Sequence, residues 1–121
     1  MFTFYTDRFI PSRFSGYSVG PVILIRPSAK QDVGLLEHEK THRRQWLKTG
    51  GLHSFLYVLS KQYRLKAEAE AYAKQVEYTD SRPIDLFAFF ICTKYGLSIS
   101  EKEAKEAILS FLPDDLRHEL Q

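Results

Sequence analysis

Two histidines and a glutamate with a metal-binding spacing occur near the middle of the chain. His38, Glu39 and His42 form the pattern H-E-x-x-H. Residues four apart on an α-helix lie about 40° apart around its axis, so the two imidazole rings project from one face and can share one ion. Glu39 lies close enough to reach a metal-bound water without binding the metal. Because zinc lowers the pKa of such a water and a carboxylate can take its proton, the pattern predicts a hydrolytic zinc site.

A catalytic zinc ion needs a third protein ligand and leaves its fourth position for water. The remaining histidines, His53 and His118, and several acids are available. Residues 64–73 stand out, because glutamates alternate there with alanines in a segment expected to be helical. Small side chains let two helices approach closely, which a glutamate needs in order to reach an ion on the neighbouring helix.

These features together resemble the gluzincin class of zinc metallopeptidases, especially its minimal single-domain members. In that class H-E-x-x-H is followed by a glutamate on a second helix, as Glu68 follows His42 here by about 26 residues. Several of its families place this glutamate in the pattern E-x-x-A-D. Residues 68–71 match E-x-x-A, whereas Tyr72 stands where the families have an Asp that commonly supports a ligand histidine.

The resemblance implies a zinc-dependent hydrolase with a defined set of site residues. His38, His42 and Glu68 are the expected zinc ligands, and Glu39 is the expected general base. Glu70 is the reserve for the third ligand. It lies about 200° from Glu68 around the helix axis, so only one of the two can face the metal. Peptide hydrolysis is the implied reaction and a peptide or protein the implied substrate.

The resemblance covers about residues 20–78 and implies a zincin-like minimal domain. An edge strand such as Val22–Ile25 is expected to bind an extended peptide by β-addition. Stabilisers of the oxyanion are less well defined, and the candidates stay open: His53, Tyr63, Tyr72 and Arg64. His53 is expected to be a cap or loop residue and His118 a surface residue.

The composition predicts one α+β domain over residues 1–121, with a small N-terminal sheet followed by about four helices. Residues 1–30 form its β-rich part, 31–78 the metal-binding helices and 79–121 the C-terminal helices. Val22–Ile25 is the best strand candidate. The expected helices cover Asp32–Leu47, a region from Leu52 to Tyr78 that is either one helix or two, Pro83–Lys94, and a segment that opens at the capping box of Ser100 and Glu103 and ends before Pro113. The tail beyond Asp114 is expected to fray.

The charge and composition of the chain limit the partners and the location that are expected for it. The chain has 17 basic and 15 acidic side chains and a net charge of +2, too small an imbalance to indicate nucleic acid or an anionic membrane. Cys92 is the only cysteine, so no internal disulfide can form. The sequence shows no signal peptide and no transmembrane span, and a cytoplasmic location is therefore expected.

Two other interpretations compete with a zinc peptidase. Glu39-x-x-His42 also fits the E-x-x-H of di-iron helix bundles, for which Asp115-x-x-His118 is the one partial second copy. The other alternative is a catalytically inactive metal-binding or helical protein-interaction module. The oligomeric state and the cleavage specificity stay open at this point.

Overall fold

The predicted α+β fold is confirmed in the computed structural model, which describes residues 2–121. Within this range a three-stranded sheet and a 3₁₀ turn precede six α-helices. The elements are β1 (Phe2–Tyr5), β2 (Gly16–Val19), β3 (Val22–Ile25), the turn η1 (Pro27–Ala29), α1 (Val33–Lys48), α2 (His53–Leu59), α3 (Lys61–Glu77), α4 (Ile84–Lys94), α5 (Glu101–Ser110) and α6 (Asp114–Leu120).

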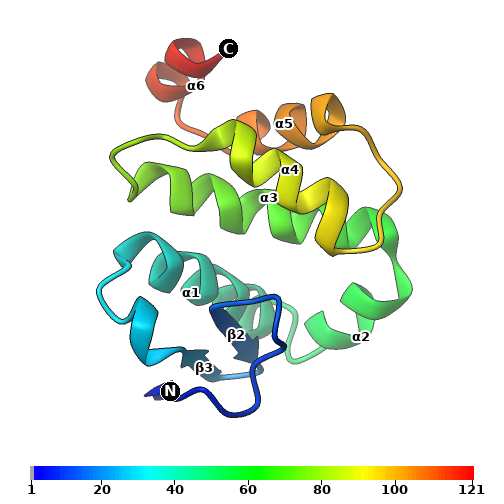
Figure 1. Ribbon diagram of the computed structural model, residues 1–121. Helices are drawn as coiled ribbons and strands as arrows, with labels where there is room; N and C mark the ends of the chain where they lie inside the picture. The colour runs from blue at the N-terminus through cyan, green and yellow to red at the C-terminus, as the bar shows by residue number, and fades with distance from the viewer. Residues whose placement is uncertain (1) are drawn as a thin grey trace.

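The elements stack in layers, as Figure 1 shows. The sheet lies against α1, α1 lies against α3, and α3 in turn is covered by α4 and α5. The short helix α2 lies at one side, where the chain passes from α1 to α3, and α6 lies at the end of the stack opposite the sheet. The proposed metal-binding helices therefore form the middle of the molecule.

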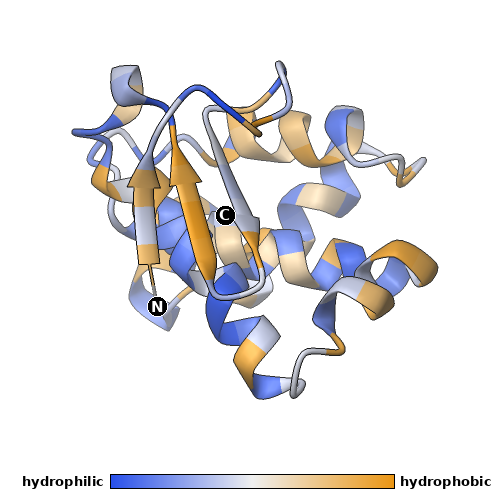
Figure 2. Ribbon diagram, turned by 90° about the horizontal axis from the view of Figure 1, so that it is seen from below, coloured by the Kyte–Doolittle hydropathy of each residue, from blue (hydrophilic) through white to orange (hydrophobic). Residues whose placement is uncertain are grey.

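The sheet has the strand order β1-β3-β2, in which β1 pairs parallel to β3 and β2 pairs antiparallel to it. The β-branched run of β3 explains its central place, because this strand is apolar along its whole length and Ile23 and Ile25 are buried (Figure 2). A two-residue turn at Gly20, whose φ is +57°, joins β2 to β3. Since β3 is central, the expectation that Val22–Ile25 is an edge strand is wrong; the edge strands are β1 and β2.

The two central helices each begin after a residue whose side chain caps the N-terminus of the helix. Asp32 accepts a hydrogen bond from the backbone N–H of Leu35 at 2.9 Å and starts α1. Ser60 accepts one from the N–H of Tyr63 at 3.1 Å and starts α3. Ser60 itself is extended, which breaks the region from Leu52 to Tyr78 into two helices. The predicted capping box of Ser100 and Glu103 is present at the start of α5.

The C-terminal part departs from the sequence-based expectation. The structure has six α-helices within residues 2–121 instead of about four. One reason is the break at Ser60; the other is that residues 114–120 form α6 instead of fraying. Leu116 of α6 is buried in the apolar core, and this burial stabilises a seven-residue helix that would be marginal alone. Across the described residues, no helix is long and apolar enough to cross a membrane.

Candidate metal centre

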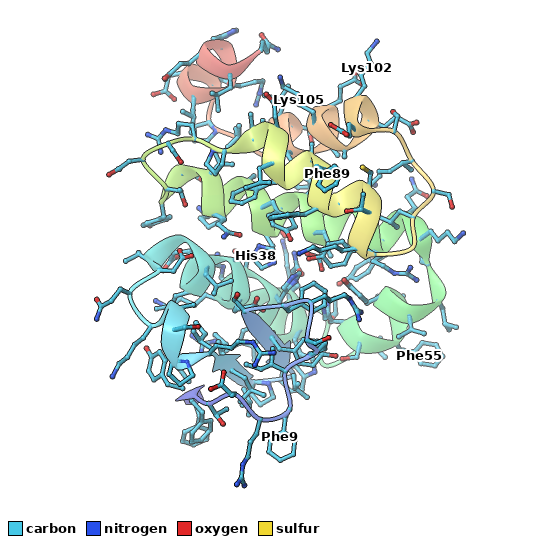
Figure 3. The ribbon with its side chains drawn as sticks, in the orientation of Figure 1. Phe9, His38, Phe55, Phe89, Lys102 and Lys105 are labelled. Carbon is cyan, nitrogen blue, oxygen red and sulfur yellow. The ribbon has the colours of Figure 1, made fainter. Side chains whose placement is uncertain are left out.

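Three side chains from two helices meet in the interior between α1 and α3. His38 and His42 project from the same face of α1, and Glu68 reaches them from α3. Each offers a ligand atom, and these atoms lie within 4.8 Å of one another. All three side chains are buried, and Glu68 is only 2% exposed. Figure 3 shows His38 between the lower and upper layers of the molecule.

Two of the donor separations, one to each oxygen of Glu68, are close to those of a tetrahedral zinc site. Glu68 Oε1 lies 3.4 Å from His38 Nε2, and Glu68 Oε2 lies 3.2 Å from His42 Nε2. Ligands bound at about 2.0–2.2 Å in a tetrahedron are separated by about 3.3 Å. In addition, Glu68 Oε1 is buried and has no hydrogen-bond partner among residues 2–121. The chemistry of the three residues and two of their separations are therefore compatible with a zinc ion.

The charges of His42 and Glu68 stabilise one another. Burial tends to raise the pKa of Glu68, but the two histidines outweigh it and hold that pKa below its usual value. Burial likewise opposes a charged His42, yet the Glu68 carboxylate prevails and raises the pKa of His42 to about 9. Glu68 is thus an ionised carboxylate inside the protein, a state that requires a positive partner.

A series of hydrogen bonds behind His42 fixes the orientation of its imidazole ring. The Oε1 atom of Gln45 lies 2.9 Å from His42 Nδ1, so Nδ1 donates and Nε2 is left to face Glu68. Gln45 in turn donates through Nε2 to Glu70 Oε1 at 2.8 Å and to the carbonyl of Ala67 at 3.0 Å. Glu70, the reserve third ligand, is not part of the ligand cluster. Glu70 instead accepts a hydrogen bond from Gln45, which in turn contacts the expected ligand His42.

His38 is held differently. Its ring makes an edge contact with Tyr72, with the centroids 4.4 Å apart. The Tyr72 hydroxyl is hydrogen-bonded to that of Tyr95 at 2.8 Å and does not reach the ring. His38 Nδ1 is buried and has no partner among residues 2–121. His38 is therefore positioned by aromatic packing against Tyr72.

Glu39 lies beside the cluster and faces the edge of the sheet. It is 5% exposed, and burial raises its pKa, while the nearby histidines act in the opposite direction. A Cβ atom added at Gly16 of β2 would lie 3.1 Å from Glu39 Oε2 and 3.3 Å from Glu39 Cγ. The absence of a side chain at Gly16 therefore lets strand β2 approach the expected general base closely.

These residues line a cleft with a volume of about 540 Å³. One wall comes from β2 and the following turn, through Gly16, Tyr17, Ser18 and Gly20. Another part of the lining comes from α2 and the start of α3. His38, Glu39, His42 and Glu68 all contribute to its lining, so the buried cluster is in contact with the cleft. A volume of this size is typical of sites that bind a small molecule or a few residues of a peptide.

Two aromatic groups of α2 face the cluster. His53 is the first residue of α2 and lines the cleft, with its ring centroid 5.9 Å from that of His42. Burial lowers the pKa of His53, which favours a neutral ring, and its Nδ1 lies 2.8 Å from the Tyr63 hydroxyl. Tyr57 lines the cleft as well, and its hydroxyl donates to Glu68 Oε2.

The other residues considered from the sequence have structural roles or lie elsewhere. Arg64 lines the cleft, but its guanidinium donates to the carbonyls of Tyr57, Val58 and Tyr95. His118 is exposed on α6, as expected for a surface residue. Asp115 is exposed on the same helix, at the far end of the molecule from the cluster (Figure 1). The second half of a di-iron site is therefore not assembled from these two residues.

Sequence reasoning missed Gln45, Tyr57 and Gly16 as parts of the site. Gln45 lies three residues after His42 on the same helix, a spacing at which side chains meet, and this signal was available. Nothing local indicates Tyr57 or Gly16, because both reach the site through the tertiary fold. The expectation that His53 is only a cap or loop residue is also incomplete, because His53 lines the cleft.

The chain matches no protein-family model, curated protein or solved structure with which it was compared.

Proposed function

We propose that this protein is a zinc-dependent hydrolase that cleaves peptide bonds, with a minimal domain of the zincin type. The observation that carries the proposal is the convergence of His38, His42 and Glu68 within 4.8 Å, beside Glu39 and in contact with a cleft. The order of a strand, an H-E-x-x-H helix and a second helix with a glutamate supports the gluzincin resemblance. A buried cluster of this kind is expensive to maintain unless a ligand or a reaction uses it.

His38, His42 and Glu68 are the residues that would hold zinc. A zinc ion bound there supplies a water of lowered pKa and polarises a substrate carbonyl. Glu39 takes a proton from the attacking water at its carboxylate and delivers it to the leaving amine. Burial raises the pKa of the Glu39 carboxyl, whereas the positive charge of a bound zinc ion would act in the opposite direction.

His53 is the residue best placed to stabilise negative charge on the attacked carbonyl oxygen. Its pKa is lowered, so the ring is neutral at pH 7. Burial raises the pKa of Tyr63, so its hydroxyl keeps its proton and can donate to His53 Nδ1, which leaves the proton on Nε2. Tyr63 is then a positioning residue. Tyr57, whose hydroxyl already donates to Glu68, orients the carboxylate.

The free edge of β2 gives an extended substrate a place to bind. β2 is an edge strand and lines the cleft beside Glu39. A peptide that pairs with this edge places its backbone next to the ligand cluster, and backbone pairing is tolerant of side-chain sequence. This assigns to β2 the role that the sequence alone assigned to Val22–Ile25.

The test combines metal content with turnover, on protein purified without a histidine tag. We expect about one zinc per chain in both the native protein and Glu39→Gln. Hydrolysis of a mixed peptide library, followed by mass spectrometry, should fall about 10²- to 10⁴-fold in Glu39→Gln. Zinc binding without hydrolysis in the native protein would instead indicate the inactive metal-binding module. Failure to bind zinc would refute the proposed site.

A further inference from the structure

Outside the ligand cluster, the cleft is lined by three arginine and lysine residues, Arg13, Arg64 and Lys94. The acidic residues of the same lining are Glu39 and Glu68, which belong to the cluster itself. No ion pair formed among residues 2–121 includes Arg13 or Lys94. The chain as a whole is close to neutral, so this excess of positive charge is local.

The backbone of Arg13 is held at the cleft, while its guanidinium forms no ion pair among residues 2–121. The loop that carries it is fastened by Arg26, whose guanidinium donates to the carbonyls of Phe14, Ile10 and Pro11. The Arg13 side chain itself is exposed and lies over the Phe14 ring, 4.7 Å from its centroid. Within the described part of the chain it makes no hydrogen bond to another side chain.

Lys94 approaches the same point from the other end of the sequence. It lies in the last turn of α4, and its Nζ donates to the carbonyl of Arg13 at 3.2 Å. The ammonium group lies 4.1 Å from the centroid of Phe90 and 5.9 Å from that of Phe14. The stacked rings of Phe14 and Tyr95, 5.7 Å apart, complete this contact between the loop and α4.

Two like charges that line one cleft without a counter-ion create a positive potential there, which attracts an anion. A guanidinium offers paired donors that match a carboxylate, and an ammonium adds a compact charge beside it. Arg64 strengthens the potential, although its own donors hold backbone carbonyls. The metal cluster lies in the same cleft, so a bound anion and a bond to be cleaved would belong to one ligand.

We propose that Arg13 and Lys94 form a subsite for a carboxylate of the substrate. The substrate is then a peptide that carries an acidic side chain, or its own C-terminal carboxylate, near the bond to be cleaved. This inference rests on the proposed function, because it describes the specificity of the same cleft. It adds a substrate class that the metal ligands by themselves do not define.

The experiment compares matched peptides with the zinc-loaded protein. One pair differs only by Glu against Gln at a position near the cleaved bond, scanned on both sides; a second pair differs only by a free or an amidated C-terminus. We expect kcat/KM to favour the carboxylate form about tenfold at low salt, with the preference falling at 0.5 M NaCl, because salt screens charge pairs. Dependence on Glu identifies a side-chain carboxylate, and dependence on amidation identifies the C-terminus. Independence of both overturns the proposal.

Binding without turnover separates this inference from the proposed function. Fluorescence anisotropy with the same peptides and zinc-loaded Glu39→Gln should show the same preference. Absence of hydrolysis together with preferential binding of the carboxylate peptides would refute the peptidase and keep the subsite. Hydrolysis or binding without a preference would refute the subsite alone, and failure of every peptide to bind and to be cleaved would refute it as well.

Charge reversal tests which residues are responsible. Arg13→Glu should remove the preference for Glu over Gln and favour a matched Lys peptide; Lys94→Gln should reduce the preference about threefold. Lys102→Glu is the matched control, because Lys102 is exposed on α5 and lies far from the cleft (Figure 3). An equal effect of Lys102→Glu would show a general field of the protein and overturn the subsite. Arg13 is exposed, so its variant remains informative if Lys94→Gln unfolds.

Discussion

The two buried faces of α3 differ in character. One face carries Ala69, Ala73 and Val76 into an apolar core shared with α4, α5 and α6. The other face carries Glu68 and Gln75 toward α1, where buried polar side chains collect. Adjacent residues of a helix point about 100° apart, so Glu68 and Ala69 can face different layers although they are neighbours in sequence.

The difference teaches that stability and chemistry are supplied by separate sides of one helix. Burial of apolar surface between α3, α4 and α5 provides the favourable free energy of folding. The interface between α1 and α3 buries charged groups, which costs free energy unless they are paired. Perturbing the apolar side and the polar side of α3 should therefore produce different results.

Metal binding should have the largest effect on the polar side. At free zinc about 1,000-fold above its dissociation constant, the free energy of unfolding should rise by about 4 kcal/mol, because only the folded chain brings the three ligands together. Urea denaturation with zinc or with EDTA measures the difference. His38→Ala should abolish the response to zinc. A native protein whose stability ignores zinc would contradict the assignment of the ligands.

A cavity on the apolar side should destabilise the fold without affecting the metal. Ile108 of α5 is fully buried, and Ile108→Ala should lower the free energy of unfolding by about 3 kcal/mol. The increase in stability on adding zinc should stay that of the native protein. Leu59→Ala is the control, since Leu59 is 68% exposed and its loss should cost less than about 0.5 kcal/mol. A weakened zinc response in Ile108→Ala would show that the two faces are coupled.

The series of hydrogen bonds behind His42 should strengthen zinc binding. Gln45→Leu removes the acceptor for His42 Nδ1 and should weaken zinc binding about 10- to 100-fold, measured by competition with a chelator. Glu70→Gln should weaken it less, because the amide can still accept from Gln45. Glu77→Gln, on the same helix but paired with Lys74 at the surface, should leave the affinity unchanged. If Glu70→Gln abolishes binding, Glu70 is a ligand.

A last substitution tests how closely α1 and α3 must approach. A Cβ atom at Gly34 would overlap with Thr79 Oγ1 and lie 3.2 Å from Gln75 Cγ. Gly34→Ala should therefore destabilise the fold by about 1–3 kcal/mol, read from the urea midpoint. Adding Thr79→Ala should restore part of the loss by removing the atom that overlaps. No destabilisation by Gly34→Ala would show that the two helices can separate without cost.

The parts that were predicted correctly depend on local rules. The helix bearing His38 and His42 follows from its cap at Asp32, and α5 follows from its capping box. The helix α6 was missed because its stability comes from burying Leu116 against distant residues, which a polar local sequence does not reveal. Likewise, the apolar run of β3 indicated a strand correctly but not whether that strand is central or at an edge.

The sequence by itself determined the local chemistry of this protein. A spacing of four on a helix places the rings of His38 and His42 on one face and Glu39 beside them, whatever the rest of the fold. The tertiary structure decided which glutamate reaches those rings, because Glu68 and Glu70 have the same chemistry and only the packing of α3 on α1 distinguishes them. It also brought Arg13 to Lys94 across 81 residues, a contact that no local pattern encodes because chain folding alone sets such distances.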